Sequence, residues 1–200
     1  MERVNRILRN PVYREALQKN QEAEKERRYC HHDMAHFLDV ARIAMLLAAK
    51  EQITAAREQP LPISEEKELH AFEDGSLPIS EEKELHAFED RSLPISEEIV
   101  YAAALVHDIG RYRQYEDGTP HEEASAALAA DILLDSGFDE KETHVIIDAV
   151  RSHRNAGIAE EKSLRGLLYR ADKLSRACFA CPAQGDCNWS AEKKNMRLVL

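Results

Sequence analysis

Three side chains that can bind metals or transfer protons lie on the apolar faces of separate predicted helices. His36 and His107 share helical spacing with aliphatic neighbours, and Asp172 follows Leu168 by four residues. Burial of an unpaired carboxylate or imidazole costs free energy, whereas one shared cation would satisfy all three groups. Asp108 directly follows His107 and adds a second carboxylate. Histidine and carboxylate ligands without sulfur indicate a divalent ion such as Fe, Mn, Zn, Ni or Co. The alternative is a set of separate core histidines, each with its own local hydrogen bonds.

The helices that must position these groups are marked by start and stop signals. Small polar N-caps, proline at the first helical position and glycine stops are typical of helix boundaries. The expected helices are one opened by Asn10-Pro11, then about 33–57, 96–110, 119–137 with a capping box at Thr119-Pro120-His121-Glu122, 139–153 with the same device at Asp139 and Glu142, and one from Ser163 through Asp172. No segment shows the polar–apolar alternation of a strand. The predicted fold class is therefore all-α, a compact helical bundle.

An acidic tandem repeat interrupts what is otherwise a chain of single-domain size. The 200 residues, 22.8 kDa, are enough for one domain with a core of its own. Residues 61–92 hold two nearly identical 16-residue copies, LPISEEKELHAFEDGS and LPISEEKELHAFEDRS. Their charges of −4 and −3 make up most of the net charge of −10. We therefore expect an exposed insertion, and we do not assign its acidity to an active surface.

Charge and hydropathy argue against two kinds of partner. The chain has no basic stripe of the kind that nucleic-acid binding requires. No apolar run approaches the roughly 18–20 residues of a membrane helix, and the opening MERVNRILRN lacks the apolar stretch of a signal peptide. We expect a cytoplasmic protein that acts on neither nucleic acid nor membrane.

The order of these ligand-type residues resembles a known family signature. His36, then His107-Asp108, then Asp172 is similar to the H…HD…D pattern of the HD superfamily of metal-dependent phosphohydrolases. The words HFLDVARIA, ALVHDIGRYRQ and LYRADKLSR carry the resemblance, which covers about residues 30–176 once the repeat is set aside. It implies a single HD domain over residues 1–200, a helical bundle of the HD type.

Two more histidines refine the resemblance. His121 and His153 resemble the additional pair in HD proteins that hold two metal ions. By this resemblance His36, His107, Asp108 and Asp172 would hold one ion, and His121 and His153 would hold the other with Asp108 as the bridge. Sites with one ion or none stay open, because His121 could be an exposed residue at a helix start.

The resemblance implies hydrolysis of a small phosphorylated metabolite or nucleotide through a metal-activated water. Asp108 and Arg111 are the candidate catalytic residues. Arg111 stands where many family members have lysine, and arginine keeps the charge but not the shape of that group. Two other functions remain open, a di-iron oxygenase with much the same ligands and a catalytically idle binding or regulatory domain.

The cysteines form a second candidate site, centred on the Cys-rich segment 176–200. Cys178, Cys181 and Cys187 have the spacing C-x2-C-x5-C, and Cys30 precedes His36 by six residues just as Cys178 follows Asp172 by six. Antiparallel helices meeting at one ion would bring Cys30 beside Cys178. A structural zinc or an iron–sulfur cluster is possible there, with the adjacent His31 and His32 as substitute ligands. The alternative is a mixture of buried and exposed thiols. The tail beyond Cys187 could fold back on the chain or support a homo-oligomer.

Overall fold

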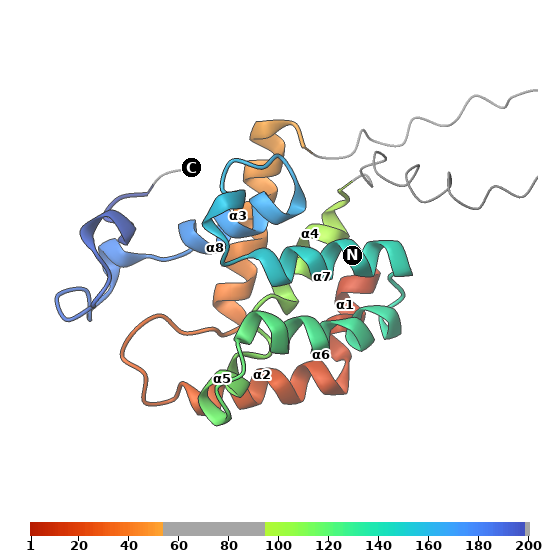
Figure 1. The fold of residues 1–200 in the computed structure, drawn as a ribbon, viewed down its shortest axis with the longest axis horizontal. Helices are drawn as coiled ribbons and strands as arrows, with labels where there is room; N and C mark the ends of the chain where they lie inside the picture. Colours follow the sequence, from red (N-terminus) through yellow and green to blue (C-terminus); the bar gives the residue numbers. More distant parts are fainter. Residues whose placement is uncertain (54–94, 199–200) are drawn as a thin grey trace, which may run out of the picture. The chain divides into compact units, whose positions relative to one another are not determined.

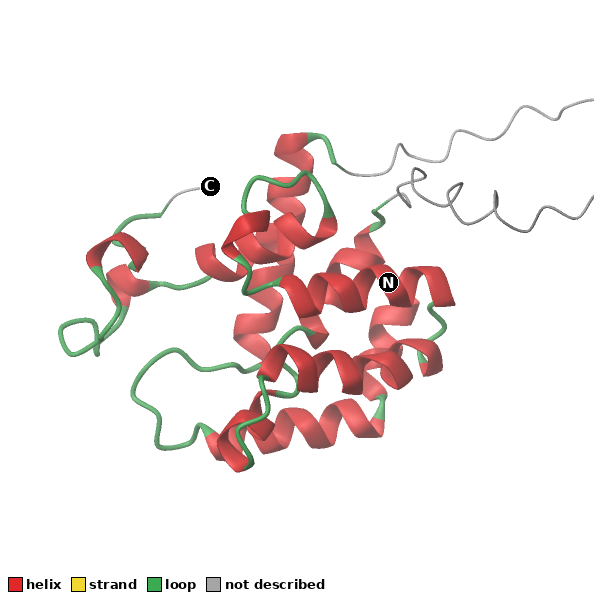
Figure 2. Ribbon diagram, in the orientation of Figure 1, coloured by secondary structure: helices red, strands yellow, loops and turns green. Residues whose placement is uncertain are grey.

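The computed structural model describes residues 1–53 and 95–198, and this part of the chain contains helices and no strand (Figures 1 and 2). The helices are α1 Glu2–Arg9, α2 Pro11–Ala23, α3 Met34–Glu51, α4 Glu97–Val106, α5 Arg111–Glu116, α6 His121–Asp135, α7 Glu140–Ser152 and α8 Leu164–Leu174, with short 3-10 turns at Ala156–Ile158, Cys178–Ala180 and Ala191–Lys193. The predicted all-α class is confirmed. The repeat at 61–92 lies outside the described residues.

Several helix starts follow the predicted capping chemistry. The Asn10 side chain accepts hydrogen bonds from the backbone N–H groups of Val12 (2.9 Å) and Tyr13 (3.2 Å), and Pro11 takes the first helical position of α2. Asp139 and Glu142 form both halves of a capping box at the start of α7. Each of these caps satisfies backbone donors that the first helical turn leaves unpaired.

Other predicted boundaries are wrong. Thr119 does not cap α6: its hydroxyl donates to Asp117, and Pro120 occupies the N-cap position without a side-chain bond. The helix expected over 96–110 ends at Val106, and α5 begins at Arg111 after a turn. The helix α3 ends at Glu51, and residues 54–57 of its expected extension lie outside the described part. The sequence signals also missed α1.

The helix α4 forms the centre of the bundle. Every residue from Ile99 to Val106 except Tyr101 is buried, and α4 contacts α1, α3, α6, α7 and α8 (Figure 1). A helix that is apolar on all sides is stable only when neighbours cover it completely. The two residues that follow its last turn, His107 and Asp108, therefore emerge in the interior of the bundle and not at its surface.

Close packing fixes the turn that carries these two residues. Gly110 lies so near the start of α6 that an added Cβ would be 2.4 Å from the backbone nitrogen of Ser125. The Gly110 N–H donates to Ser125 Oγ at 2.9 Å. Glycine is required here because no larger residue fits between the turn and α6.

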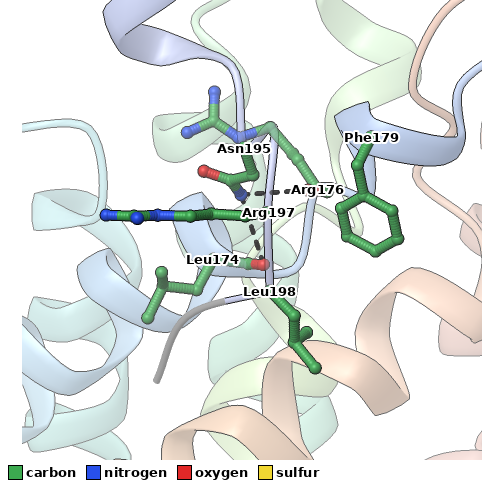
Figure 3. A pocket seen from close by; sticks show the side chains of 6 residues that line it. All are labelled: Leu174, Arg176, Phe179, Asn195, Arg197 and Leu198. Atoms are coloured by element: carbon green, nitrogen blue, oxygen red, sulfur yellow. Dashed lines mark hydrogen bonds between the residues drawn. The ribbon is translucent and has the colours of Figure 1, made fainter.

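The C-terminal segment packs against the end of α8. The Asn195 side-chain amide donates to the carbonyls of Leu174 (3.3 Å) and Arg176 (2.9 Å), as Figure 3 shows. It also donates to the carbonyl of Lys173 at 2.8 Å. The Arg176 guanidinium lies 4.1 Å from the centroid of the Trp189 ring. These contacts attach the Cys-rich segment to the helix that carries Asp172. Among the described helices, none has both the length and the apolar character needed to cross a membrane.

Candidate metal centre

Three helices bring the first group of predicted ligands together. His36 lies on α3, His107 follows α4 and Asp172 lies on α8. His36 Nε2 is 3.3 Å from His107 Nε2 and 3.7 Å from Asp172 Oδ1, while His107 Nε2 is 4.0 Å from the same carboxylate oxygen. Each residue offers one ligand atom, and the three atoms are close enough to share one ion.

The second group forms around the other side of Asp108. Asp108 Oδ1 lies 3.1 Å from His121 Nε2 and 3.6 Å from His153 Nε2, whereas Oδ2 lies 3.4 Å from His107 Nε2. His121 is buried, so it is not the exposed helix-start residue that the sequence left possible. The two oxygens of Asp108 thus face different ligand groups, which is the arrangement of a bridging carboxylate.

Backbone carbonyls orient two of the imidazole rings. His107 Nδ1 lies 2.7 Å from the carbonyl of Ala104, and His153 Nδ1 lies 2.6 Å from that of Val150. A carbonyl can only accept, so Nδ1 carries the proton in each ring and Nε2 keeps its lone pair. This is the usual way in which a protein prepares a histidine for a metal. His121 Nδ1 is 2.6 Å from Gln114 Oε1, which does the same for the third ring.

The protonation states also suit a cation. Burial lowers the pKa of His107 to about 3 and that of His121 to about 4, so both rings are neutral near pH 7. Burial opposes ionisation of Asp108, but the imidazoles of His107, His32 and His153 outweigh it and hold the pKa of Asp108 well below its usual range. Burial lowers the pKa of His153, but Asp108 outweighs it and raises the pKa. Neutral imidazoles such as His107 and His121 beside an ionised carboxylate are the states in which these groups bind metals.

One buried atom shows what the site needs. Asp108 Oδ1 is inaccessible to solvent and has no hydrogen-bond partner among the described residues, although His121 Nε2 lies 3.1 Å and His153 Nε2 3.6 Å away. An ionised oxygen left unpaired in the interior is strongly destabilising. Divalent cations held by His36, His107, Asp108, Asp172, His121 and His153 would remove this cost, so the residues fit the metal that the sequence predicted. The nitrogen and oxygen donors keep Fe, Mn, Zn, Ni and Co as candidates.

The structure adds His32 and Glu24, which sequence reasoning did not place here. His32 was considered only as a substitute ligand beside the cysteines, yet its Nε2 lies 3.6 Å from Asp108 Oδ2. Its Nδ1 lies 2.6 Å from Oε1 of the buried Glu24. The four-residue spacing between His32 and His36 was the available signal. Nothing in the sequence pointed to Glu24.

Arg111 lies at the edge of the centre. Its Nη1 is 3.2 Å from both ring nitrogens of His121, and its Nε is 3.5 Å from Glu24 Oε1. Burial lowers the pKa of Arg111, but Asp108 and Tyr115 outweigh it and raise the pKa further above its ordinary value. Arg111 is therefore a permanent positive charge beside the ligands. Three other arginines form ion pairs with acidic neighbours: Arg113 with Asp117, Arg151 with Glu123 and Arg154 with Glu122.

The cysteine segments also approach one another. The Tyr29 hydroxyl donates to the carbonyl of Asp186 at 3.2 Å, which joins the residues next to Cys30 and Cys187. Burial raises the pKa of the Cys30 thiol, and nearby Cys178 raises it further. All four thiols are free. Among the described residues, the groups compact enough for a metal contain no cysteine, so a sulfur-rich site is still only a prediction.

Comparison with known proteins defines the family. The family model of the HD domain matches residues 34–177, and the chain belongs to this family. An "Uncharacterized protein" of Clostridium beijerinckii is 34% identical over 198 residues, which cover 99% of each chain. No solved structure matches the chain.

Proposed function

We propose that this protein is a metal-dependent phosphohydrolase that acts on a small phosphorylated metabolite or nucleotide. The observation that carries the proposal is the buried carboxylate of Asp108, whose two oxygens face two separate ligand groups and whose Oδ1 has no hydrogen-bond partner. A dinuclear centre bridged by Asp108 explains both facts. Membership of the HD domain family, which is of the metal-dependent hydrolase type, supports the same conclusion.

When bound, divalent ions would acidify water enough to supply a nucleophile near neutral pH and would polarise a phosphoryl oxygen. The chain's own residues have simpler tasks. Asp108 fixes the distance between the two ligand groups, and His107 and His153 each direct Nε2 into the site because Nδ1–H donates to a backbone carbonyl. No side-chain nucleophile is needed for this chemistry, and the ligand groups among the described residues contain no cysteine.

Arg111 supplies the positive charge that a phosphate substrate requires. Its side chain is 16% exposed and its Nε is buried, so the neighbours fix its position while part of the side chain borders solvent. A guanidinium presents several N–H donors in one plane and binds two phosphate oxygens at once. We therefore assign Arg111 to binding the substrate phosphate and neutralising charge as the ester bond breaks.

The direct test is phosphate release from a panel of small phosphoesters, such as sugar phosphates and nucleoside monophosphates, by metal-loaded protein without oxygen. Release that requires metal and is lost in Asp108→Ala supports the proposal. Turnover only with iron and dioxygen would replace it with an oxygenase. Bound metal without any turnover would indicate a binding or regulatory domain.

A further inference from the structure

We propose that His32 is an additional metal ligand of this centre, held in place by Glu24, and that it binds the ion on the His36 side. The inference rests on the proposed metal-dependent function and adds a ligand that the H…HD…D pattern does not contain. His32 Nε2, His36 Nε2 and an Asp108 oxygen lie close enough together to contact one ion.

Glu24 fixes the orientation of the His32 ring with two contacts to the same residue. The backbone N–H of His32 donates to Glu24 Oε2 at 2.7 Å, and Nδ1 lies 2.6 Å from Glu24 Oε1. An ionised carboxylate only accepts, so Nδ1 carries the proton and Nε2 keeps its lone pair. That nitrogen faces Asp108 Oδ2 at 3.6 Å. A carboxylate, a histidine and a metal in this order are a recurrent arrangement in metalloproteins.

The carboxylate is itself built into the core. Glu24 is 2% exposed and stands at the C-terminal cap of α2. The Tyr115 hydroxyl donates to its Oε1 at 2.7 Å. Arg111 Nε also lies 3.5 Å from Glu24 Oε1, so this buried carboxylate borders Arg111 as well as holding His32 towards Asp108.

His32 adds a ligand to the ion bound through His36, and no third metal site is required to accommodate it. His36 belongs to two compact groups, one with His32 and Asp108 and one with His107 and Asp172, and its Nε2 lies 3.3 Å from His107 Nε2. His32 therefore joins the ion bound through His36. The ring planes of His32 and His36 are nearly perpendicular, with centroids 5.3 Å apart, so their Nε2 atoms can converge without the rings colliding.

The test is a cobalt titration of the metal-free protein, followed by calorimetry and by visible absorption, for the wild type and four variants. His32→Ala is expected to bind one Co²⁺ at least tenfold more weakly and to change the absorption bands, because a nitrogen ligand is lost. Glu24→Gln should weaken the same ion about 10- to 100-fold, as loss of outer-shell partners does elsewhere. His144→Ala is the matched control, since His144 is an exposed histidine on α7 outside both candidate sites, and it should match the wild type. Circular dichroism verifies that each variant keeps its helices.

Asp108→Ala distinguishes failure of the role assigned to His32 from failure of the metal centre itself. If Asp108→Ala loses Co²⁺ while His32→Ala binds with wild-type affinity and spectrum, the role of His32 is wrong and the metal centre stands. If Asp108→Ala also retains all its Co²⁺, the centre itself is wrong. Should His32→Ala fail to fold, a crystal structure of the cobalt-loaded wild type decides, since a ligand Nε2 must lie about 2.0–2.2 Å from the ion. A longer distance, with water between, would overturn the assignment.

Discussion

The side-chain amide of Asn20 on α2 donates a 2.9 Å hydrogen bond to the backbone carbonyl of Asp108, 88 residues later in the chain. Its carbonyl oxygen accepts the N–H of Tyr112 at 2.7 Å. Asn20 is fully buried, so both bonds form without competition from water. One amide thereby closes the turn between α4 and α5 from both sides and fixes the backbone that presents the Asp108 carboxylate.

Replacement of Asn20 by alanine should weaken both the fold and the metal site. Two buried backbone groups would lose their partners, at a cost of about 2–4 kcal/mol in the free energy of unfolding. Urea denaturation of the metal-free protein measures this loss, and a metal titration should show weaker binding. Gln18→Ala, an exposed change on the same helix, is the control. Equal stability of Asn20→Ala and Gln18→Ala would refute the role assigned to this amide.

Gly110→Ala should be among the most damaging single-methyl additions in the chain. The new Cβ would lie 2.4 Å from Ser125 N and 2.5 Å from the carbonyl carbon of Ala124, and backbone atoms cannot move aside as side-chain ends do. We expect a loss of roughly 3 kcal/mol in unfolding free energy. Gly185→Ala is the matched change, because nothing lies within 4 Å of its added Cβ. Thermal unfolding of the two variants compares them, and equal melting temperatures would contradict the packing of α6 on this turn.

The contribution of Glu98 should depend on pH. Its carboxylate accepts from Arg3 Nε at 2.6 Å and from the Met1 amine at 2.7 Å, linking α1 to α4. Burial raises its pKa, but these partners outweigh it and lower the pKa from 4.5 to about 2. Because the folded-state pKa is the lower one, the stabilisation is present above pH 4.5 and is lost as the pH falls towards 2.

Glu98→Gln should therefore cost about 1 kcal/mol at pH 7 and less at pH 4. Urea denaturation of the metal-free wild type and variant at both pH values measures the difference. A gap that stays constant or widens at pH 4 would show that the ion pairs of α1 are not its source.

Removal of the Arg111 charge should separate catalysis from metal binding. If Arg111 neutralises phosphate charge, Arg111→Ala should lower kcat about 10²- to 10³-fold while the metal content stays unchanged. Arg111→Lys should recover part of the loss, since it keeps the charge but not the planar donors. Arg113→Ala, a surface change within the same helix, is the control. An unchanged kcat in Arg111→Ala would remove this residue from the mechanism.

The sequence predicts the metal centre better than it predicts the boundaries around it. The ligand candidates could be found because each polar group interrupts an apolar helical face, and a shared site accounts for His36, His107 and Asp172 together. Their order along the chain then matched the HD signature. The turn after α4 was missed because His107 has helical φ and ψ, so no local signal marks the end of that helix.

The parts that the sequence did not reveal depend on tertiary packing. Glu24 lies at the end of a highly charged stretch, and nothing local separates it from its solvated neighbours. It becomes distinct only in the folded chain, where Tyr115 of α5 and His32, in the loop between α2 and α3, both contact its carboxylate. The expected capping box at Thr119 failed for a similar reason, since Asp117 competes for the same hydroxyl.

The metal content of purified protein, measured by mass spectrometry for the wild type and Asp108→Ala, tests the central claim most directly. Asp135→Ala, an exposed aspartate on α6, is the control. We predict about two divalent ions per chain in the wild type and in the control. Asp108→Ala should lose both ions and keep its helix content, because each ion would use that carboxylate as a ligand. Metal retained in full by Asp108→Ala would contradict the bridging role of Asp108 and the enzyme that we propose on it.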